Sequence, residues 1–548
     1  MPVIIGKEKK HPFVRGVYEG VTTKMIMKYL SDNQKDSYYK ILTTPESFKK
    51  VKKAIRNVNM EMYKDFFLLF DECEKIIQDL DYRKNIALPI DDFFRFENKA
   101  MVSATALIPS DPRFEQQGFI LKKIVPNFAH AQKIVLYPTN NVRVTLKMAL
   151  QALQEADKTE EDKICIFFNS INCIENLVTF LKIKGKSNIY CSTDSLEKLK
   201  SRGFKNVFDN LATKEGKIDF NKYNFFTSRF YSAVDIELPY KPNVIMITDI
   251  YAAPHTTIDP ETEAVQIAGR FRNGIKNLVH ITNYNRKLEY KEPDVLSIYL
   301  AEQHEVYTKM LEMYNDSEGL GEMHILQQAL GNVDYSRFIT EKGKKDYFMY
   351  DNAFRDEYVK GLYVQPIKVK NSYVNTGKFE VTYKYINSAL SDTELKELKS
   401  NNISKKDLNK LVYKIIKQHL KLKNDYDNEY VISLSKSYKL IFEAIEVLGE
   451  TELLETGFNE ETIKTAIANK KASNKMRSKG VIVAVHKAFS ENTWYRTSKI
   501  NAKLKAIFTY FDLPTDGRGI APKIKLYFEA EKDRKGAVRG WKLTKKIY

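Results

Sequence analysis

The stretch Phe66-Phe67-Leu68-Leu69-Phe70-Asp71-Glu72-Cys73-Glu74 decides how this 548-residue chain folds. Its five apolar residues follow one another without alternation, which is typical of a strand buried on both faces of a parallel sheet. The run ends at once in two adjacent carboxylates, Asp71 and Glu72. In open α/β sheets ligands bind at the carboxyl ends of the strands, so this position suits groups that act on a ligand. The alternative is an apolar strand followed by a solvated acidic turn.

Similar apolar runs alternate with helical patterns on both sides of this stretch. The segment 41–47 predicts a short strand and a helix start, because Thr-Pro-Glu-Ser is a favourable helix N-terminus. Such an N-terminus offers N–H groups to a phosphate, although a plain cap explains it equally well. Further along we expect strands at 100–106, 133–138, 163–170 and 244–249, short strands near Tyr190 and Phe225, and helices at 141–156, 174–183 and 263–270. Alternating strands and helices predict a parallel, doubly wound α/β sheet.

The basic charge of the chain is concentrated at one end. The formal net charge is +18, and residues 471–548 carry 19 Lys+Arg against 6 Asp+Glu, a net charge of +13. Such a concentration favours binding to a polyanion, most often nucleic acid, over a merely solvated surface.

The same C-terminal region predicts a small folded domain. Helical patterns at 478–490 and 497–511 precede strands at 523–528 and 537–544, joined by the turn Lys532-Asp533-Arg534-Lys535-Gly536. Two helices with a charged hairpin suggest a winged-helix-like nucleic-acid-binding domain, in which Lys532, Arg534 and Lys535 contact the nucleic acid. Four aromatic residues stack on bases or, as we favour for most of them, pack a small core: Trp494, Tyr495, Tyr527 and Trp541.

Several classes of protein are excluded by composition. No run of 18 apolar residues occurs, so no membrane span is expected. Residues 1–20 lack the apolar core of a signal peptide. The four cysteines are sparse and have no zinc-binding spacing, which fits buried thiols in a reducing cytoplasm. A hydrophobic content of 43% supports globular folding, and the length predicts three to four domains.

Six segments occur in an order that resembles superfamily-two helicases. They are Thr43-Thr44-Pro45-Glu46-Ser47, Asp71-Glu72-Cys73-Glu74, Ser103-Ala104-Thr105, Ile166-Phe167-Phe168-Asn169-Ser170, the segment 226–236, and Gln266-Ile267-Ala268-Gly269-Arg270-Phe271-Arg272. They are similar to motifs Ib, II (the DExx box), III, IV, V and VI of that family. Within that superfamily, the six segments most resemble those of phage and viral replication helicases, including the herpesvirus-type origin-binding ones.

The resemblance implies two RecA-like lobes that close over ATP and Mg²⁺. Asp71 would hold the metal and Glu72 would activate the water, while Gln266 orients the attack and Arg270 and Arg272 neutralise phosphate charge. Ser103 and Thr105 would couple closure to nucleic acid, and Asp235 would contact the nucleotide ribose. Contacts to nucleic-acid phosphates would come from Thr44, Ser47, Asn169 and Thr227.

The chain departs from the family pattern in three places. The last arginine of motif VI stands one place early, at Arg272, and the glycine position of motif V holds Ala233. No Gly-x-x-x-x-Gly-Lys-Ser/Thr loop (Walker A) occurs, since Gly185-Lys186-Ser187 has Phe180 at the position of the first glycine. In the family this loop lies several dozen residues before the Thr-Thr-Pro-Glu-Ser segment, and only 42 residues precede Thr43. We therefore expect a partial first lobe, and three explanations stay open for the missing loop: a fragment of a longer chain, a split gene whose other product carries the loop, or a protein that truly lacks it.

We predict an ATP-dependent nucleic-acid helicase or translocase of the cytoplasm, directed to DNA rather than RNA and related to phage replication. Its expected domains are a partial first lobe at 1–128, a second lobe at 129–288, a mostly helical accessory region at 289–470 and the winged-helix-like domain at 471–548. The alternative is a non-catalytic nucleic-acid-binding subunit of a replication complex. A packaging motor is disfavoured by motif VI and by the absence of an acidic nuclease cluster after the second lobe.

Overall fold

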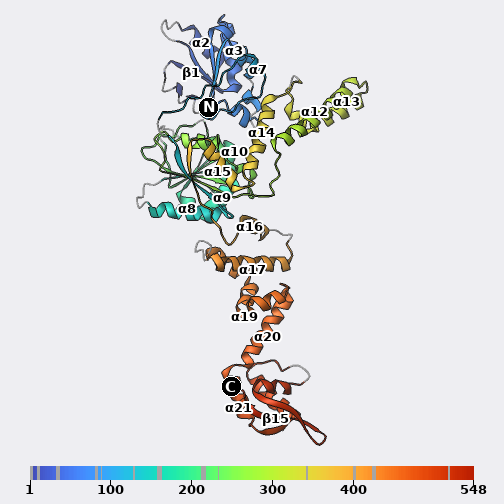
Figure 1. Ribbon diagram of the computed structural model, residues 1–548. Helices are drawn as coiled ribbons and strands as arrows, with labels where there is room; N and C mark the ends of the chain where they lie inside the picture. Colours follow the sequence, from blue (N-terminus) through green and yellow to red (C-terminus); the bar gives the residue numbers. More distant parts are fainter. Residues whose placement is uncertain are drawn as a thin grey trace. The chain divides into compact units, whose positions relative to one another are not determined.

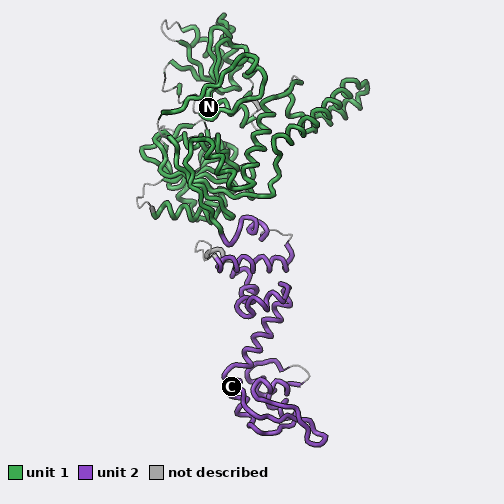
Figure 2. Tube along the Cα trace, viewed as in Figure 1, with its two compact units in different colours: residues 1–387 green, residues 388–548 purple. Residues whose placement is uncertain are grey.

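The computed structural model describes residues 4–5, 7–8, 11, 13–32, 38–80, 84–87, 89–127, 130–156, 163–211, 218–232, 234–340, 343–398, 403–422, 428–515 and 519–548. Figure 2 shows its two compact units, Met1–Asn387 and Ser388–Tyr548. Each unit contains hydrophobic cores of its own. Ala233, at the position of the expected glycine in the segment 226–236, lies outside the described residues.

The first lobe of unit 1 is a partial α/β structure, as expected. Its strands form two separate parallel pairs, β1 with β2 and β3 with β4. Its elements are β1 (Val14–Val17), α2 (Thr23–Ser31), β2 (Lys40–Thr43), the 3₁₀ helix η1 (Pro45–Ser47), α3 (Phe48–Asn57), α4 (Met62–Asp65), β3 (Phe67–Asp71), α5 (Lys75–Gln78), η2 (Lys84–Ala87), α6 (Ile90–Phe93), β4 (Asn98–Val102) and α7 (Arg113–Gln116).

The strand β3 is buried on one face only, so the prediction of burial on both faces is wrong. Leu68 and Phe70 pack against the core of the lobe. Phe67 is 61% exposed and Leu69 53% exposed, because they point to the other face and β3 has only β4 as a neighbour. No element among the described residues covers that apolar face.

The second lobe is built on an eight-stranded, wholly parallel sheet with the order β12-β5-β11-β10-β6-β9-β7-β8. Apolar side chains fill a core on each side of it, which explains the continuous apolar runs of its strands. The elements are β5 (Gln132–Pro138), α8 (Val142–Ala156), β6 (Ile164–Phe167), α9 (Ile171–Phe180), η3 (Lys184–Lys186), β7 (Ser187–Tyr190), α10 (Thr193–Ser201), β8 (Val207–Phe208), β9 (Tyr223–Phe226), η4 (Ser228–Phe230), β10 (Asn243–Thr248), η5 (Pro254–Thr256), α11 (Glu263–Gly269), β11 (Asn277–Thr282) and β12 (Phe379–Tyr383). The predicted α/β class and the main predicted strands and helices of this lobe are confirmed.

Four helices lie in the chain between β11 and β12: α12 (Pro293–Asp316), α13 (Leu320–Asn332), α14 (Tyr347–Leu362) and α15 (Pro366–Asn375), with η6 (Asp334–Phe338). In Figure 1, α12 and α13 project from the body of unit 1. The helix α14 packs on both lobes, because Phe348 belongs to the core of the first lobe and Leu362 to that of the second. Residues 289–387 therefore belong to unit 1, whereas the sequence grouped 289–470 into one accessory region.

Unit 2 begins with helices and ends in a small α/β domain. The helices are α16 (Asp392–Leu398), α17 (Lys405–Leu422), α18 (Asn428–Ser437), α19 (Lys439–Glu455) and α20 (Glu460–Met476). The small domain contains α21 (Lys479–Ala488), β13 (Thr493–Arg496), α22 (Thr497–Tyr510), η8 (Ala521–Leu526), β14 (Phe528–Lys535) and β15 (Val538–Lys546).

The small domain matches the predicted helices and hairpin, with one correction. Residues 521–526 form a 3₁₀ helix rather than a strand, since Ile524 turns into the core and the strand begins at Phe528. The helix α20 leads into this domain, and Met476 at its end packs in the domain's core. Trp541 and Tyr527 are buried there, as favoured for most of the aromatic residues.

No helix among the described residues is long and apolar enough to cross a membrane. All four cysteines are free thiols, and only Cys173 is partly exposed.

Candidate active site between the two lobes

The turn after β3 places two carboxylates at the carboxyl end of the strand. Asp71 is exposed, and its Oδ1 accepts a hydrogen bond of 3.0 Å from the Glu72 backbone N–H. Glu72 has a φ of 52°, a left-handed conformation that residues other than glycine rarely adopt. Such an outlier is often found at functional sites.

The second lobe contributes two side chains from the end of α11. Gln266 and Arg270 stand one helical turn apart, and Arg270 Nε donates to the Gln266 carbonyl at 3.1 Å. The Arg270 guanidinium also donates to Gln266 Oε1. The amide therefore holds the arginine in one orientation and leaves its own Nε2 free to reach the first lobe.

These side chains meet the first lobe in a buried polar cluster. Gln266 Nε2 donates to Glu74 Oε1 at 2.9 Å and to Thr105 Oγ1 at 3.1 Å. Arg270 Nη1 lies 3.4 Å from Glu72 Oε1. Glu74 is fully buried, and Gln266 and Arg270 are only 3% and 8% exposed. The structure thus joins the turns after β3 and β4 of the first lobe to the end of α11 in the second.

Burial sets the protonation of the cluster. Desolvation raises the pKa of the Glu74 carboxyl above its ordinary value, and the Ser103 hydroxyl opposes this shift. Ser103 also accepts a 2.8 Å hydrogen bond from the Thr105 N–H, which fixes the turn after β4. The two predicted coupling residues therefore lie beside Glu74, within reach of any movement of Gln266.

A second pair of groups lies next to this cluster. Desolvation raises the pKa of Glu263 on α11 to about 7, although the positive charge of Lys75 on α5 opposes the shift. Burial alone would lower the pKa of Lys75, but Asp79 and Glu263 outweigh it and raise that pKa. Gln78 adds a hydrogen bond to the Thr262 hydroxyl across the same boundary.

The structure does not bring Arg272 to the cluster. Its Nη2 forms a 2.6 Å ion pair with Asp235 Oδ1, and both side chains are about half exposed. Arg272, which stands one place earlier than the resemblance led us to expect, is therefore paired with a residue of its own lobe. Arg270 alone points across the boundary at Glu72.

The predicted phosphate contacts lie in two places in unit 1. Thr44 caps η1 and Ser47, which is buried, begins the turn into α3. Asn169 and Thr227 follow the adjacent strands β6 and β9, where Asn169 Oδ1 accepts the Ser228 N–H at 3.1 Å. Thr227 is buried and its hydroxyl donates to the Tyr190 carbonyl, whereas Arg229, two residues later, is exposed.

The basic residues predicted in the small C-terminal domain lie on one strand. Lys532, Arg534 and Lys535 are exposed on β14, the first strand of the hairpin. Lys532 lies 5.7 Å from the ring centre of Trp541, and Lys535 lies 5.2 Å from that of Trp494. These cation–π contacts orient the lysines along the hairpin.

The donor set at Asp71 fits Mg²⁺. Mg²⁺ usually takes one or two protein carboxylates and completes its shell with water and substrate phosphates. Among the described residues no group of three or more His, Cys, Asp or Glu side chains could form a dedicated metal cage, and exposed Asp71 supplies a single carboxylate. These features suit a metal that arrives with a nucleotide.

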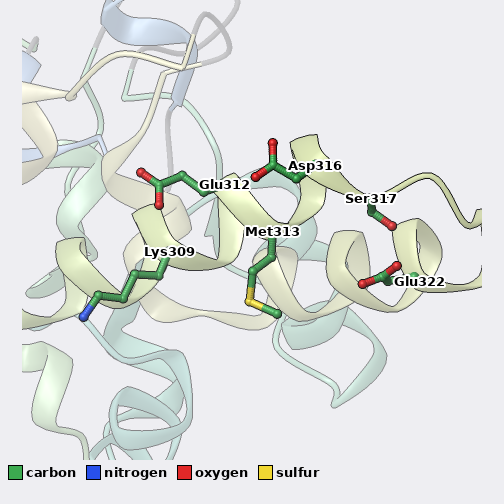
Figure 3. A pocket seen from close by; sticks show the side chains of 6 residues that line it. All are labelled: Lys309, Glu312, Met313, Asp316, Ser317 and Glu322. Carbon is green, nitrogen blue, oxygen red and sulfur yellow. The ribbon is translucent and has the colours of Figure 1, made fainter.

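A shallow pocket of about 420 Å³ lies elsewhere, at the turn between α12 and α13. Figure 3 shows its lining side chains, Lys309, Glu312, Met313, Asp316, Ser317 and Glu322. Three carboxylates against one lysine disfavour a phosphate, so we do not place a nucleotide there.

Sequence reasoning missed two residues of the site. Glu74 belongs to the same acidic turn as Asp71, so its position three residues later was the available signal. Lys75 carried no signal, because its partner Glu263 is distant in the sequence and only the fold brings them together.

No family model matches the sequence, and no curated protein matches it. Similar solved structures include S. cerevisiae Dbp5 bound to RNA and ADP BeF3, with 15% identity over 53% of this chain and 67% of that chain at a TM-score of 0.30. Mss116p bound to ssRNA and AMP-PNP shows 12% identity over 69% of this chain and 76% of that chain, with a TM-score of 0.32. The ATP-dependent Type ISP restriction-modification enzyme LlaBIII bound to DNA shows 10% identity over 92% of this chain and 35% of that chain, with a TM-score of 0.34.

Proposed function

We propose that unit 1 is the motor of an ATP-dependent nucleic-acid translocase or helicase. The observation that carries this proposal is the buried cluster in which Gln266 and Arg270 of one lobe meet Glu72, Glu74 and Thr105 of the other. Carboxylates opposed by an arginine across a movable boundary suit hydrolysis of a nucleoside triphosphate.

The reaction transfers the γ-phosphoryl group of ATP to water. The water oxygen forms a bond to the γ-phosphorus as the bond to the β–γ bridging oxygen breaks, and ADP leaves with that electron pair. Glu72 orients the water and accepts its proton, while Arg270 neutralises charge that develops on the phosphoryl oxygens. Asp71 would hold Mg²⁺, which supplies charge neutralisation at the phosphates.

Hydrolysis is coupled to movement through Gln266. Its amide touches Glu74, Thr105 and the Arg270 guanidinium at once, so a shift of Arg270 toward a phosphate changes the contacts of Thr105. Asp235 contacts the ribose, and phosphates of the strand are bound by Thr44, Ser47, Asn169 and Thr227 together with Arg229.

The phosphate-binding loop is supplied by another polypeptide segment. The described sequence contains no Gly-x-x-x-x-Gly-Lys-Ser/Thr, and the apolar face of β3 with Phe67 and Leu69 is uncovered beside Asp71. A strand–loop–helix segment that covers this face would bring its lysine to the carboxylates of the turn.

The basic small domain supplies a second nucleic-acid contact through Lys532, Arg534 and Lys535. Preference for DNA, a role in phage replication and a cytoplasmic location remain predictions from the sequence.

The experiment compares phosphate release by the full chain with that by a fusion that adds a strand–Gly-x-x-x-x-Gly-Lys-Thr–helix segment before Met1. We expect ATP hydrolysis, stimulated by single-stranded nucleic acid, only in the fusion. Substituting the loop lysine by alanine in the fusion is the control and should return turnover to that of the unfused chain. Equal turnover in the fusion and its control would contradict the proposal.

A second candidate is a nucleic-acid-binding subunit without catalysis, which the missing loop favours. It predicts tight nucleic-acid binding that ATP does not change, in the fusion as well as in the unfused chain.

A further inference from the structure

Two tyrosines lie at the carboxyl edge of the large sheet, outside all the positions assigned above. Tyr284 follows the end of β11, and Tyr385 follows β12. Their ring centres are 6.4 Å apart with an angle of 60° between the planes, and their hydroxyls are 3.5 Å apart. Tyr385 is 42% exposed, so one ring of the pair is open to solvent.

The backbone holds this pair rigidly. Lys384 and Ile386, on either side of Tyr385, donate backbone hydrogen bonds of 3.0 and 2.8 Å to Leu136 and Pro138 of β5. Tyr251 Oη donates to the Tyr284 carbonyl at 3.0 Å. Backbone bonds on both sides of Tyr385 and at Tyr284 hold the two Cα positions in place, which lowers the conformational entropy lost when a flat ligand stacks on the pair.

The surroundings of the pair are aromatic and basic. Tyr383 is 37% exposed, and Lys370 Nζ lies 5.8 Å from its ring centre. Arg286, Lys287 and Lys384 are exposed nearby in sequence. Burial and the Tyr284 hydroxyl raise the pKa of Tyr385, while the Arg286 guanidinium acts against that shift, which places its charge close to the pair.

The same edge of the sheet carries the strand ends assigned to phosphate contacts. All eight strands are parallel, so Thr227 after β9, Asn169 after β6 and the tyrosine pair lie along one edge. Five strand intervals of about 4.8 Å separate β9 from β12, roughly 24 Å in total. That span accommodates several nucleotides of an extended strand.

We propose that Tyr284 and Tyr385 form a stacking platform for bases of a single-stranded nucleic acid. Aromatic rings in a basic groove bind single strands with little sequence preference, because every base offers a flat face. Arg286 and Lys384 bind the flanking phosphates. This inference rests on the proposed nucleic-acid function and adds a contact to bases where the other assigned residues contact phosphates.

The test is a binding cycle with the full chain, which removes the rings and the bases separately. Fluorescence anisotropy measures binding of a labelled single strand of about 12 nucleotides and of an abasic strand of the same length. Tyr284→Ala with Tyr385→Ala should weaken binding of the intact strand about tenfold or more, and should change binding of the abasic strand by less than about twofold. Tyr284→Phe with Tyr385→Phe keeps the rings and should bind as the unaltered chain does.

Tyr299→Ala is the matched control, because Tyr299 is also 37% exposed beside a lysine, Lys291, but lies on the acidic helix α12. It should bind both strands normally. An equal loss for intact and abasic strands, or no loss for either, would overturn the platform while leaving the nucleic-acid function in place. An unaltered chain that binds neither strand would overturn both.

Discussion

At the scale of single residues, Glu263 gives the site a dependence on pH. Desolvation raises its pKa from the ordinary 4.5 to about 7. Because the folded carboxyl holds its proton more tightly than the unfolded one, its contribution to stability is complete below about pH 4.5. That contribution is lost as the pH rises through about 7.

Glu263→Gln should therefore reduce the fall in the unfolding temperature of unit 1 between pH 5 and 8. Glutamine can still accept the Asp259 N–H that the carboxylate now accepts at 2.9 Å, and it has no charge to desolvate. Calorimetry at the two pH values is the measurement, with exposed Glu305→Gln as control. The same pH dependence in Glu263→Gln and in the unaltered chain would show that Glu263 does not cause it.

Residues whose role follows from local sequence could be predicted, and those whose role follows from packing could not. Glu72, Gln266 and Arg270 stand in segments that the sequence singled out, and the fold brings Arg270 within 3.4 Å of Glu72 and Gln266 within 2.9 Å of Glu74, whereas their catalytic roles stay predictions. Arg272 was expected at the same site, but only the fold reveals that Asp235 binds it.

At the scale of elements, the two faces of β3 should respond differently to substitution. Phe67→Ser with Leu69→Ser removes exposed side chains and should shift the unfolding temperature of unit 1 by less than about 1 °C. Leu68→Ala with Phe70→Ala opens the packed face and should cost roughly 1–3 kcal/mol per site, a shift of several degrees. Calorimetry compares the two double variants. A large loss from the exposed pair would mean that the chain covers this face itself.

The run of apolar residues in β3 could not reveal this asymmetry. A continuous apolar run shows that both faces of a strand can pack against apolar side chains. Whether both faces are buried depends on which other elements of the fold lie against them. The strands of the second lobe have the same pattern and are buried on both sides, because helices cover both faces of their sheet. At 523–528 the alternation suggested a strand, but Pro522 just before it favours the 3₁₀ helix observed at Ala521–Leu526.

At the scale of the whole molecule, the chain combines a two-lobed unit with a unit that ends in a basic domain. That the second-lobe sheet is parallel and belongs to the α/β class could be predicted, since strands and helices alternate along the chain. The addition of β12 to that sheet could not, because the segment 283–378, which contains the four helices α12 to α15, separates it from β11.

The most direct test of the proposed ATP hydrolysis measures phosphate release by the fusion that carries the added Gly-x-x-x-x-Gly-Lys-Thr segment. The fusion is measured with Glu72→Gln, Arg270→Ala or Arg272→Ala, in the presence of single-stranded nucleic acid. Glu72→Gln or Arg270→Ala should each lower turnover about 100-fold or more, since each removes a group that acts on the transition state. Arg272→Ala should lower it far less, because its ion pair with Asp235 lies within one lobe. Turnover that survives Glu72→Gln or Arg270→Ala would contradict the proposal that these two residues act on the transition state of ATP hydrolysis.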